Sequence, residues 1–62
     1  MQTIEELRAE LMYMRERLQQ VQSELMKSEN NWNWEKFEYL LDERDEIEEK
    51  ISELNQKISE LE

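Results

Sequence analysis

The chain has 62 residues, a formal net charge of −9, and no glycine, proline, cysteine or histidine. The missing cysteine excludes disulfide bonds, and the missing histidine removes the commonest metal ligand and the usual general base near neutral pH. The sequence has no apolar run long enough for a membrane span and no signal peptide, and its negative charge disfavours nucleic acids and anionic membranes. We therefore expect a cytoplasmic, non-enzymatic protein without a metal or cofactor.

Glu, Leu, Gln, Lys, Arg and Met dominate the composition, and all of them favour helices. A chain of this length buries little surface, so a lone monomer is only marginally stable. Because disulfides are excluded and no metal ligation is expected, the remaining source of stability is association with another chain. A protein partner is thus the first functional expectation.

The apolar residues of the first half recur at alternating spacings of three and four, which is a heptad pattern with apolar a and d positions. Thr3 and Glu6 have the spacing of a capping box, which predicts that a helix begins at Thr3. The predicted seam of this helix consists of Ile4, Leu7, Leu11, Met14, Leu18, Val21 and Leu25.

Three asparagines follow, at Asn30, Asn31 and Asn33, and they predict a turn because asparagine tolerates the left-handed αL conformation. Asn33 is a suitable N-cap for a second helix. With Asn33 as the cap, Trp32 and Phe37 occupy the two positions of a hydrophobic staple.

The C-terminal segment repeats the heptad pattern in a different phase, so one straight helix cannot present both seams to a single partner. The predicted second seam consists of Phe37, Leu40, Arg44, Ile47, Ile51, Leu54, Ile58 and Leu61. Only Arg44 interrupts it, and we expect its stem to pack over Val21 while the guanidinium reaches carboxylates such as Glu24 or Glu48.

In an antiparallel pair, facing a and d residues have numbers with a constant sum. Ile4 with Leu61 and Leu25 with Leu40 both sum to 65, which centres the pairing inside the predicted turn. The sequence therefore predicts one all-α domain over residues 1–62, an antiparallel two-helix coiled-coil hairpin. Its expected parts are a helix at 3–28, a turn at 29–33 and a helix at 34–61. The alternative is one continuous helix in a parallel coiled coil.

Several apolar side chains lie outside both seams, and four of the five aromatic residues fall near the turn. Aromatic residues are enriched at binding hot spots, and methionine suits adaptable surfaces. The predicted protein interface consists of Met12, Tyr13, Met26, Trp32, Trp34, Tyr39 and Leu41. Its simplest use is a homodimer of hairpins that forms a four-helix bundle, and the other possibility is a groove for a helix of a larger protein. The expected architecture resembles that of small hairpin proteins that dimerise into four-helix bundles, without a shared motif.

The acidic charge is concentrated in residues 32–62, which carry eleven acidic and four basic side chains. No histidine or glycine-containing loop accompanies these carboxylates, so we expect a solvated surface rather than a metal site. The alternative function is a small acidic regulator or inhibitor, similar to phage inhibitors or antitoxins, that blocks a basic site and possibly mimics nucleic acid. A segment of a longer coiled coil is a third interpretation.

Overall fold

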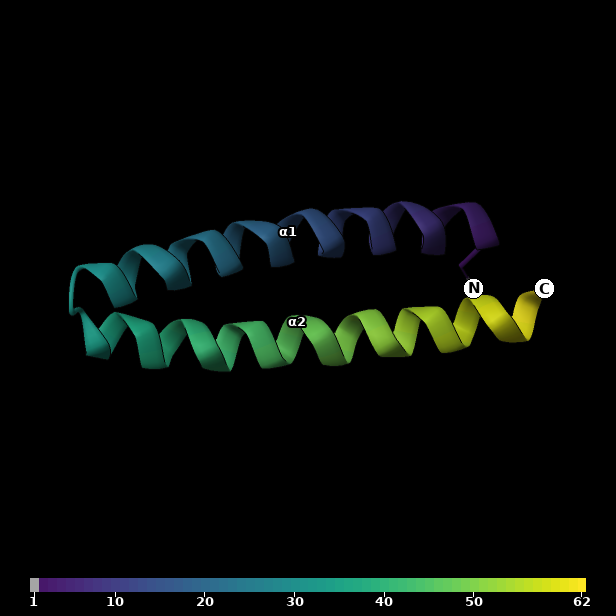
Figure 1. Ribbon diagram of the computed structural model, residues 1–62. Coiled ribbons are helices and arrows are strands. Elements are labelled where there is room, and N and C mark those ends of the chain that lie inside the picture. Colours follow the sequence, from purple (N-terminus) through teal and green to yellow (C-terminus); the bar gives the residue numbers. More distant parts are fainter. Residues whose placement is uncertain (1) are drawn as a thin grey trace.

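Two antiparallel helices joined by a short turn make up the computed structural model, which describes residues 2–62 (Figure 1). Helix α1 spans Ile4–Asn30 and helix α2 spans Trp34–Leu61. The helices lie side by side, and the Cα trace extends over 44 × 15 × 14 Å, with the two chain ends close together (Figure 1). The predicted all-α hairpin is confirmed, and the chain does not continue as one straight helix.

The core is the predicted heptad seam, and it divides into two apolar clusters. The cluster near the chain ends contains Leu7, Leu11, Leu54 and Ile58. The cluster near the turn contains Val21, Leu25, Leu40 and Ile47. Met14 and Ile51 pack against both clusters, so apolar contact is continuous along the hairpin. The outermost layer is open, because Leu61 is 47% exposed.

Two ion pairs between the helices agree with the predicted register. Arg17 pairs with Glu43, and both residues occupy g positions. Arg8 pairs with Glu62 at 2.8 Å, and both occupy e positions. Because e and g side chains flank the seam and select helix orientation, pairing of like positions is what an antiparallel arrangement requires.

Both predicted N-caps are present. The Thr3 hydroxyl accepts from the Glu6 backbone N–H at 3.2 Å and donates to the Glu6 carboxylate at 3.3 Å. The Asn33 side chain accepts from the Lys36 backbone N–H at 3.3 Å. These bonds satisfy amide groups that a helix N-terminus leaves without intrahelical partners.

Helix α1 runs to Asn30, two residues beyond the predicted end, and the turn contains only residues 31–33. The reason is that α1 ends in a Schellman motif. In this motif the Asn33 N–H donates to the Ser28 carbonyl at 2.9 Å, and the Trp32 N–H donates to the Glu29 carbonyl at 3.1 Å.

The residue in the left-handed region is Trp32, with φ of 57°, and not an asparagine as we expected. Asn31 is the C-cap of α1 and Asn33 is the N-cap of α2. The residue between the two caps must reverse the chain, and that residue is Trp32. A side chain at this position costs roughly 1–2 kcal/mol, since Cβ approaches the following carbonyl oxygen.

Truncation of a core leucine should distinguish the seam from its open end. We expect Leu54→Ala to lower the free energy of unfolding by about 2–4 kcal/mol, because Leu54 is only 2% exposed. The matched change Leu61→Ala, also at a d position, should lower it by less than about 1 kcal/mol. Chemical denaturation followed by circular dichroism at one fixed chain concentration measures both. Equal losses would contradict the described core.

Replacement of Trp32 tests the strain in the turn. We expect Trp32→Gly to raise the free energy of unfolding by about 0.5–1 kcal/mol, because glycine adopts positive φ without a steric cost. Trp32→Val should lower it, because a β-branched residue is unfavourable in the left-handed region. Urea titrations of the three proteins measure the order. A loss of stability in Trp32→Gly would mean that contacts of the indole outweigh the backbone strain.

Candidate protein-interaction surface

The two long sides of the hairpin differ in how well they cover the seam. Successive residues of a helix are about 100° apart, so e positions border the a row and g positions border the d row. We call the side with the e and b positions of both helices the e face, and the side with the g and c positions the g face. The buried d residues are Leu7, Val21, Ser28, Leu40, Ile47 and Leu54. Among the other d residues, Met14 is half-buried and Leu61 is exposed. Of the a residues, three are buried, namely Leu11, Leu25 and Ile58, and five are half-buried, namely Ile4, Leu18, Phe37, Arg44 and Ile51. The seam is therefore closed toward the g face and more open toward the e face.

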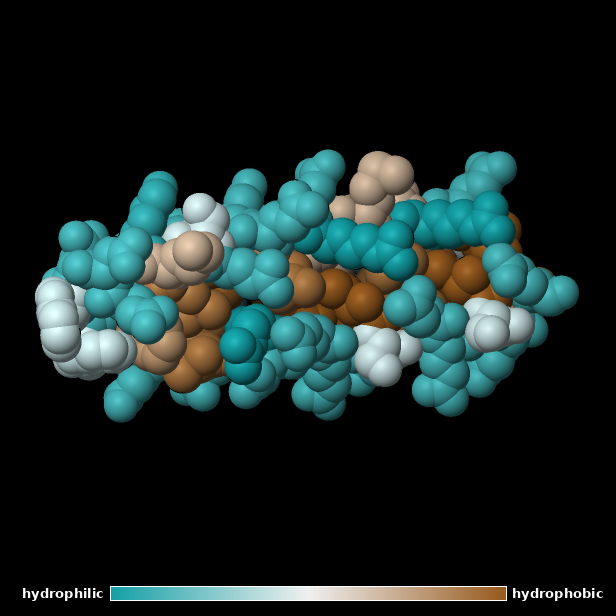
Figure 2. Space-filling model, in the orientation of Figure 1, coloured by the Kyte–Doolittle hydropathy of each residue, from teal (hydrophilic) through white to brown (hydrophobic). Residues whose placement is uncertain are grey.

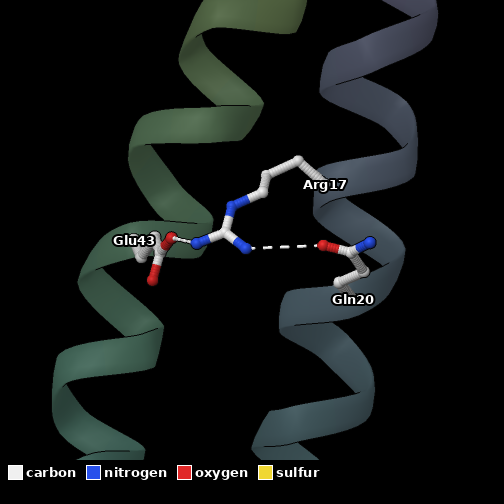
Figure 3. Close-up of polar contacts among 3 residues, drawn as sticks. All are labelled: Arg17, Gln20 and Glu43. Atoms are coloured by element: carbon white, nitrogen blue, oxygen red, sulfur yellow. Dashed lines mark hydrogen bonds and ion pairs between the residues drawn. The ribbon is translucent and has the colours of Figure 1, made fainter.

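The g face is closed by long charged side chains. Arg17 reaches across the hairpin to Glu43 and also donates to the Gln20 side chain at 3.4 Å (Figure 3). Both members of the ion pair are partly buried, with side chains 39% and 21% exposed. Because g positions lie beside the d row, their aliphatic stems shield the apolar d residues from water.

The e face exposes apolar atoms along the groove between the helices. In Figure 2 α1 lies above and runs from right to left, so the right-handed turn of the helix brings the e positions toward the viewer. A strip of hydrophobic side chains follows the groove and is broadest near the turn, with hydrophilic side chains along the outer edges (Figure 2).

Four apolar or aromatic residues on the e face near the turn form a group that we call the turn patch: Met26, Trp34, Phe37 and Leu41. Phe37 and Leu41 are half-buried and pack against the core cluster near the turn. Met26 and Trp34, at b and e positions, are 67% and 49% exposed. The turn patch therefore joins the core to solvent on the e face.

The aromatic side chains at the turn form a chain of edge-to-face contacts. The Trp34 ring lies 5.6 Å from Phe37 at an interplanar angle of 84°, and 6.0 Å from Trp32 at 87°. The expected staple between Trp32 and Phe37 is thus replaced by contacts that pass through Trp34. Trp32 remains 77% exposed at the tip of the hairpin.

The seven predicted interface residues do not share one surface. Met12 and Tyr13 are similarly exposed, at 65% and 62%, but occupy b and c positions and so belong to opposite faces. Tyr13 lines a shallow hollow with Arg17, and Tyr39 lines one with Glu43, both on the g face. On the e face lie Met12, Met26, Trp34 and Leu41.

The half-open a row, with Leu18 and Ile51 at its centre, was missed as part of the surface because we assigned both residues only to the seam. A signal was available in the flanking positions. Within the two helices every g position is charged, whereas the e positions include Gln22, Leu41 and Asn55. Shorter and uncharged residues cover an adjacent seam less well than paired arginine and glutamate do.

Arg44 reaches solvent from its place in the a row, and its contact with Glu48 is confirmed. Its guanidinium lies 3.3 Å from the Asp45 carboxylate and 3.7 Å from that of Glu48. The Arg44 Nε atom is buried and has no hydrogen-bond partner among residues 2–62. The arginine is thus held by charges of its own helix and does not contribute to the apolar seam.

The outer surface of α2 is strongly acidic. Its b, c and f positions carry eight exposed carboxylates and no basic side chain, namely Glu35, Glu38, Asp42, Asp45, Glu46, Glu49, Glu53 and Glu60. Within residues 2–62, no group of three such side chains converges in a way that could hold a metal ion. Neither helix of the described chain is long and apolar enough to cross a membrane.

No protein-family model matches the chain, and comparisons with curated proteins and with solved structures found no match. The interpretation of this surface therefore depends on its geometry alone.

Proposed function

We propose that this chain is a non-enzymatic protein-interaction module that associates with a second copy of itself through the e face. The observation that carries the proposal is that five of the eight a residues are only half-buried, which leaves apolar side chains such as Leu18 and Ile51 in contact with water on one side. A second apolar surface laid over this row would complete the seam and form a four-helix bundle.

The size of the e face supports this proposal. The hairpin is 44 Å long and 15 Å wide between Cα atoms, and side chains widen it further. A stable interface covers roughly 800 Å² of each partner, which is close to the area of one whole face. A small chain without disulfides gains most from covering such a face, because its own core is small. A helix of a larger protein could use the same groove.

Glutamate substitutions on the two faces test this proposal. Met26 and Tyr39 are 67% and 68% exposed and lie near the same end, but only Met26 lies on the e face. We expect Met26→Glu to raise the dissociation constant of the dimer at least tenfold, about 1.4 kcal/mol, because it places a charge in the interface. Tyr39→Glu should leave the constant unchanged. Light scattering from micromolar to millimolar concentration measures both.

A monomeric mass for the unmodified chain over this range would overturn self-association. Dissociation by Tyr39→Glu together with tolerance of Met26→Glu would place the interface on the g face instead. Helicity measured on the same samples shows whether each variant still forms the hairpin.

The acidic outer surface of α2 favours a second candidate function, a small regulator that covers a basic site on another protein. Eight exposed carboxylates without a basic neighbour on the same surface would attract a cationic partner at long range. The c and f carboxylates of this surface lie away from the e face groove, and only Glu38 and Asp45 belong to both, so the two functions are compatible with one hairpin.

Ionic strength separates the two functions. We expect binding of a lysine-rich peptide, used as a cationic probe, to weaken at least tenfold between 50 and 500 mM NaCl, because salt screens exposed charges. The dimer should persist or tighten over the same range, since apolar contacts are not screened. Isothermal titration calorimetry and light scattering measure the two. Replacing Glu46, Glu49 and Glu53 with glutamine should remove peptide binding and leave the dimer intact. If this variant keeps the full affinity for the peptide, the acidic surface is not the binding site.

A further inference from the structure

The e face is not uniform in charge, and this asymmetry bears on how two copies meet. Along α1, the e and b positions carry Arg8 and Arg15, and also Glu5 and Glu29 near the two ends of the helix. Along α2, the corresponding positions carry Glu38, Asp45 and Glu48 and no basic residue, and Arg44 in the adjoining a row contacts Asp45 and Glu48. The α1 side of the face is therefore balanced in charge, and the α2 side is acidic.

A two-fold axis can join two e faces in two ways. If the axis is parallel to the helices, both turns lie at the same end, and α1 of each copy lies on α2 of the other. If the axis crosses the helices, the turns lie at opposite ends. In that case α1 lies on α1 of the second copy, and α2 lies on α2 of the second copy. The two arrangements bury the same face and differ in which charges they bring together.

We propose that this hairpin forms the dimer with both turns at the same end, so that each α1 packs against the α2 of a second copy. This inference rests on the proposed self-association through the e face. Arg8 and Arg15 of α1 then lie along the acidic edge of the partner's α2, and the two acidic helices occupy the diagonal of the bundle.

The crossed arrangement brings like charges together. In it α2 lies on a second α2, and each of these helices carries ten carboxylates and only four basic side chains. Glu48 lies near mid-length of the hairpin, so it would face the partner's Glu48 across the axis. Juxtaposed like charges are unfavourable at an interface, whereas complementary charges select the correct orientation.

The heights of individual residues agree with the same arrangement. In the hairpin register, position 17 of α1 is level with Glu48 of α2, so Arg15 and Glu48 differ in height by two residues, or roughly 3 Å. Arg15 makes no ion pair within residues 2–62, whereas Arg8 and Arg17 each have a carboxylate partner. The partner's Glu48, which contacts Arg44 of its own helix at 3.7 Å, lies at the height where it can add a counter-charge for Arg15.

The turn patch provides the apolar part of the argument. With both turns at one end, the turn patches of the two copies meet, and Met26, Trp34, Phe37 and Leu41 of each copy form one continuous apolar layer. With the turns at opposite ends, the turn patch would instead lie over the opposite end of the partner, where Arg8 pairs with Glu62. Burial of an ion pair under apolar side chains carries a desolvation cost.

Distances between spin labels decide between the two arrangements, and the chain has no native cysteine to interfere. The label sites are Glu16→Cys and Asn30→Cys, one at a time. Both residues occupy exposed f positions on the outer side of α1, Glu16 near mid-length and Asn30 at the turn. An axis parallel to the helices predicts the same label separation at both sites. If the axis crosses the helices, the two labels at residue 30 are also displaced from each other along the helix direction by roughly 40 Å, at 1.5 Å per residue. The two labels at residue 16 are then displaced by almost nothing.

Pulsed electron paramagnetic resonance on the labelled dimers measures these separations. Equal separations at the two sites support the proposed arrangement. A dimeric mass with a much longer separation at Asn30 overturns the orientation and leaves the proposed self-association intact. A monomeric mass without inter-label coupling overturns both, so the two failures are distinguishable.

Discussion

Apolar contact between the a and d rows of two antiparallel helices is the interaction on which the rest of this structure depends. In proteins, tertiary packing of one apolar stripe provides most of the stability of a helix, and intrinsic helix propensity provides less. In this hairpin the stripe forms two clusters that Met14 and Ile51 join. The register of that packing then sets which charged residues meet, including Arg17 with Glu43.

The turn follows from the same packing. Once the two seams face each other, the chain must reverse within residues 31–33, and it does so without glycine. The Schellman bonds and the Asn33 cap satisfy the backbone groups at the reversal, and the cost is a left-handed Trp32. The strained residue holds its indole at the exposed tip, where it contacts Trp34 edge to face. A backbone requirement of the fold thus determines where an aromatic side chain is presented.

The difference between the two faces connects the fold to the proposed function. Charged g side chains close one side of the seam, as the partly buried Arg17–Glu43 pair illustrates, and e side chains leave the other side half-open. A two-helix hairpin has no third element to cover the remaining side. In the proposed dimer a second copy covers this groove, and the c and f carboxylates of α2 stay outside the interface.

The sequence alone determined the helical class, the two caps, the seam and the antiparallel register, because heptad spacing and capping are local properties that can be read from residue types. It did not determine which residue takes the left-handed conformation, since Asn31 and Asn33 were both better candidates until their roles as caps were known. The sequence-based prediction also placed Met12 and Tyr13 in one interface, because sequence order alone does not separate two adjacent residues outside the seam. Only the packed pair of helices decided that these two side chains belong to opposite faces, since a face is defined by the direction toward the partner helix.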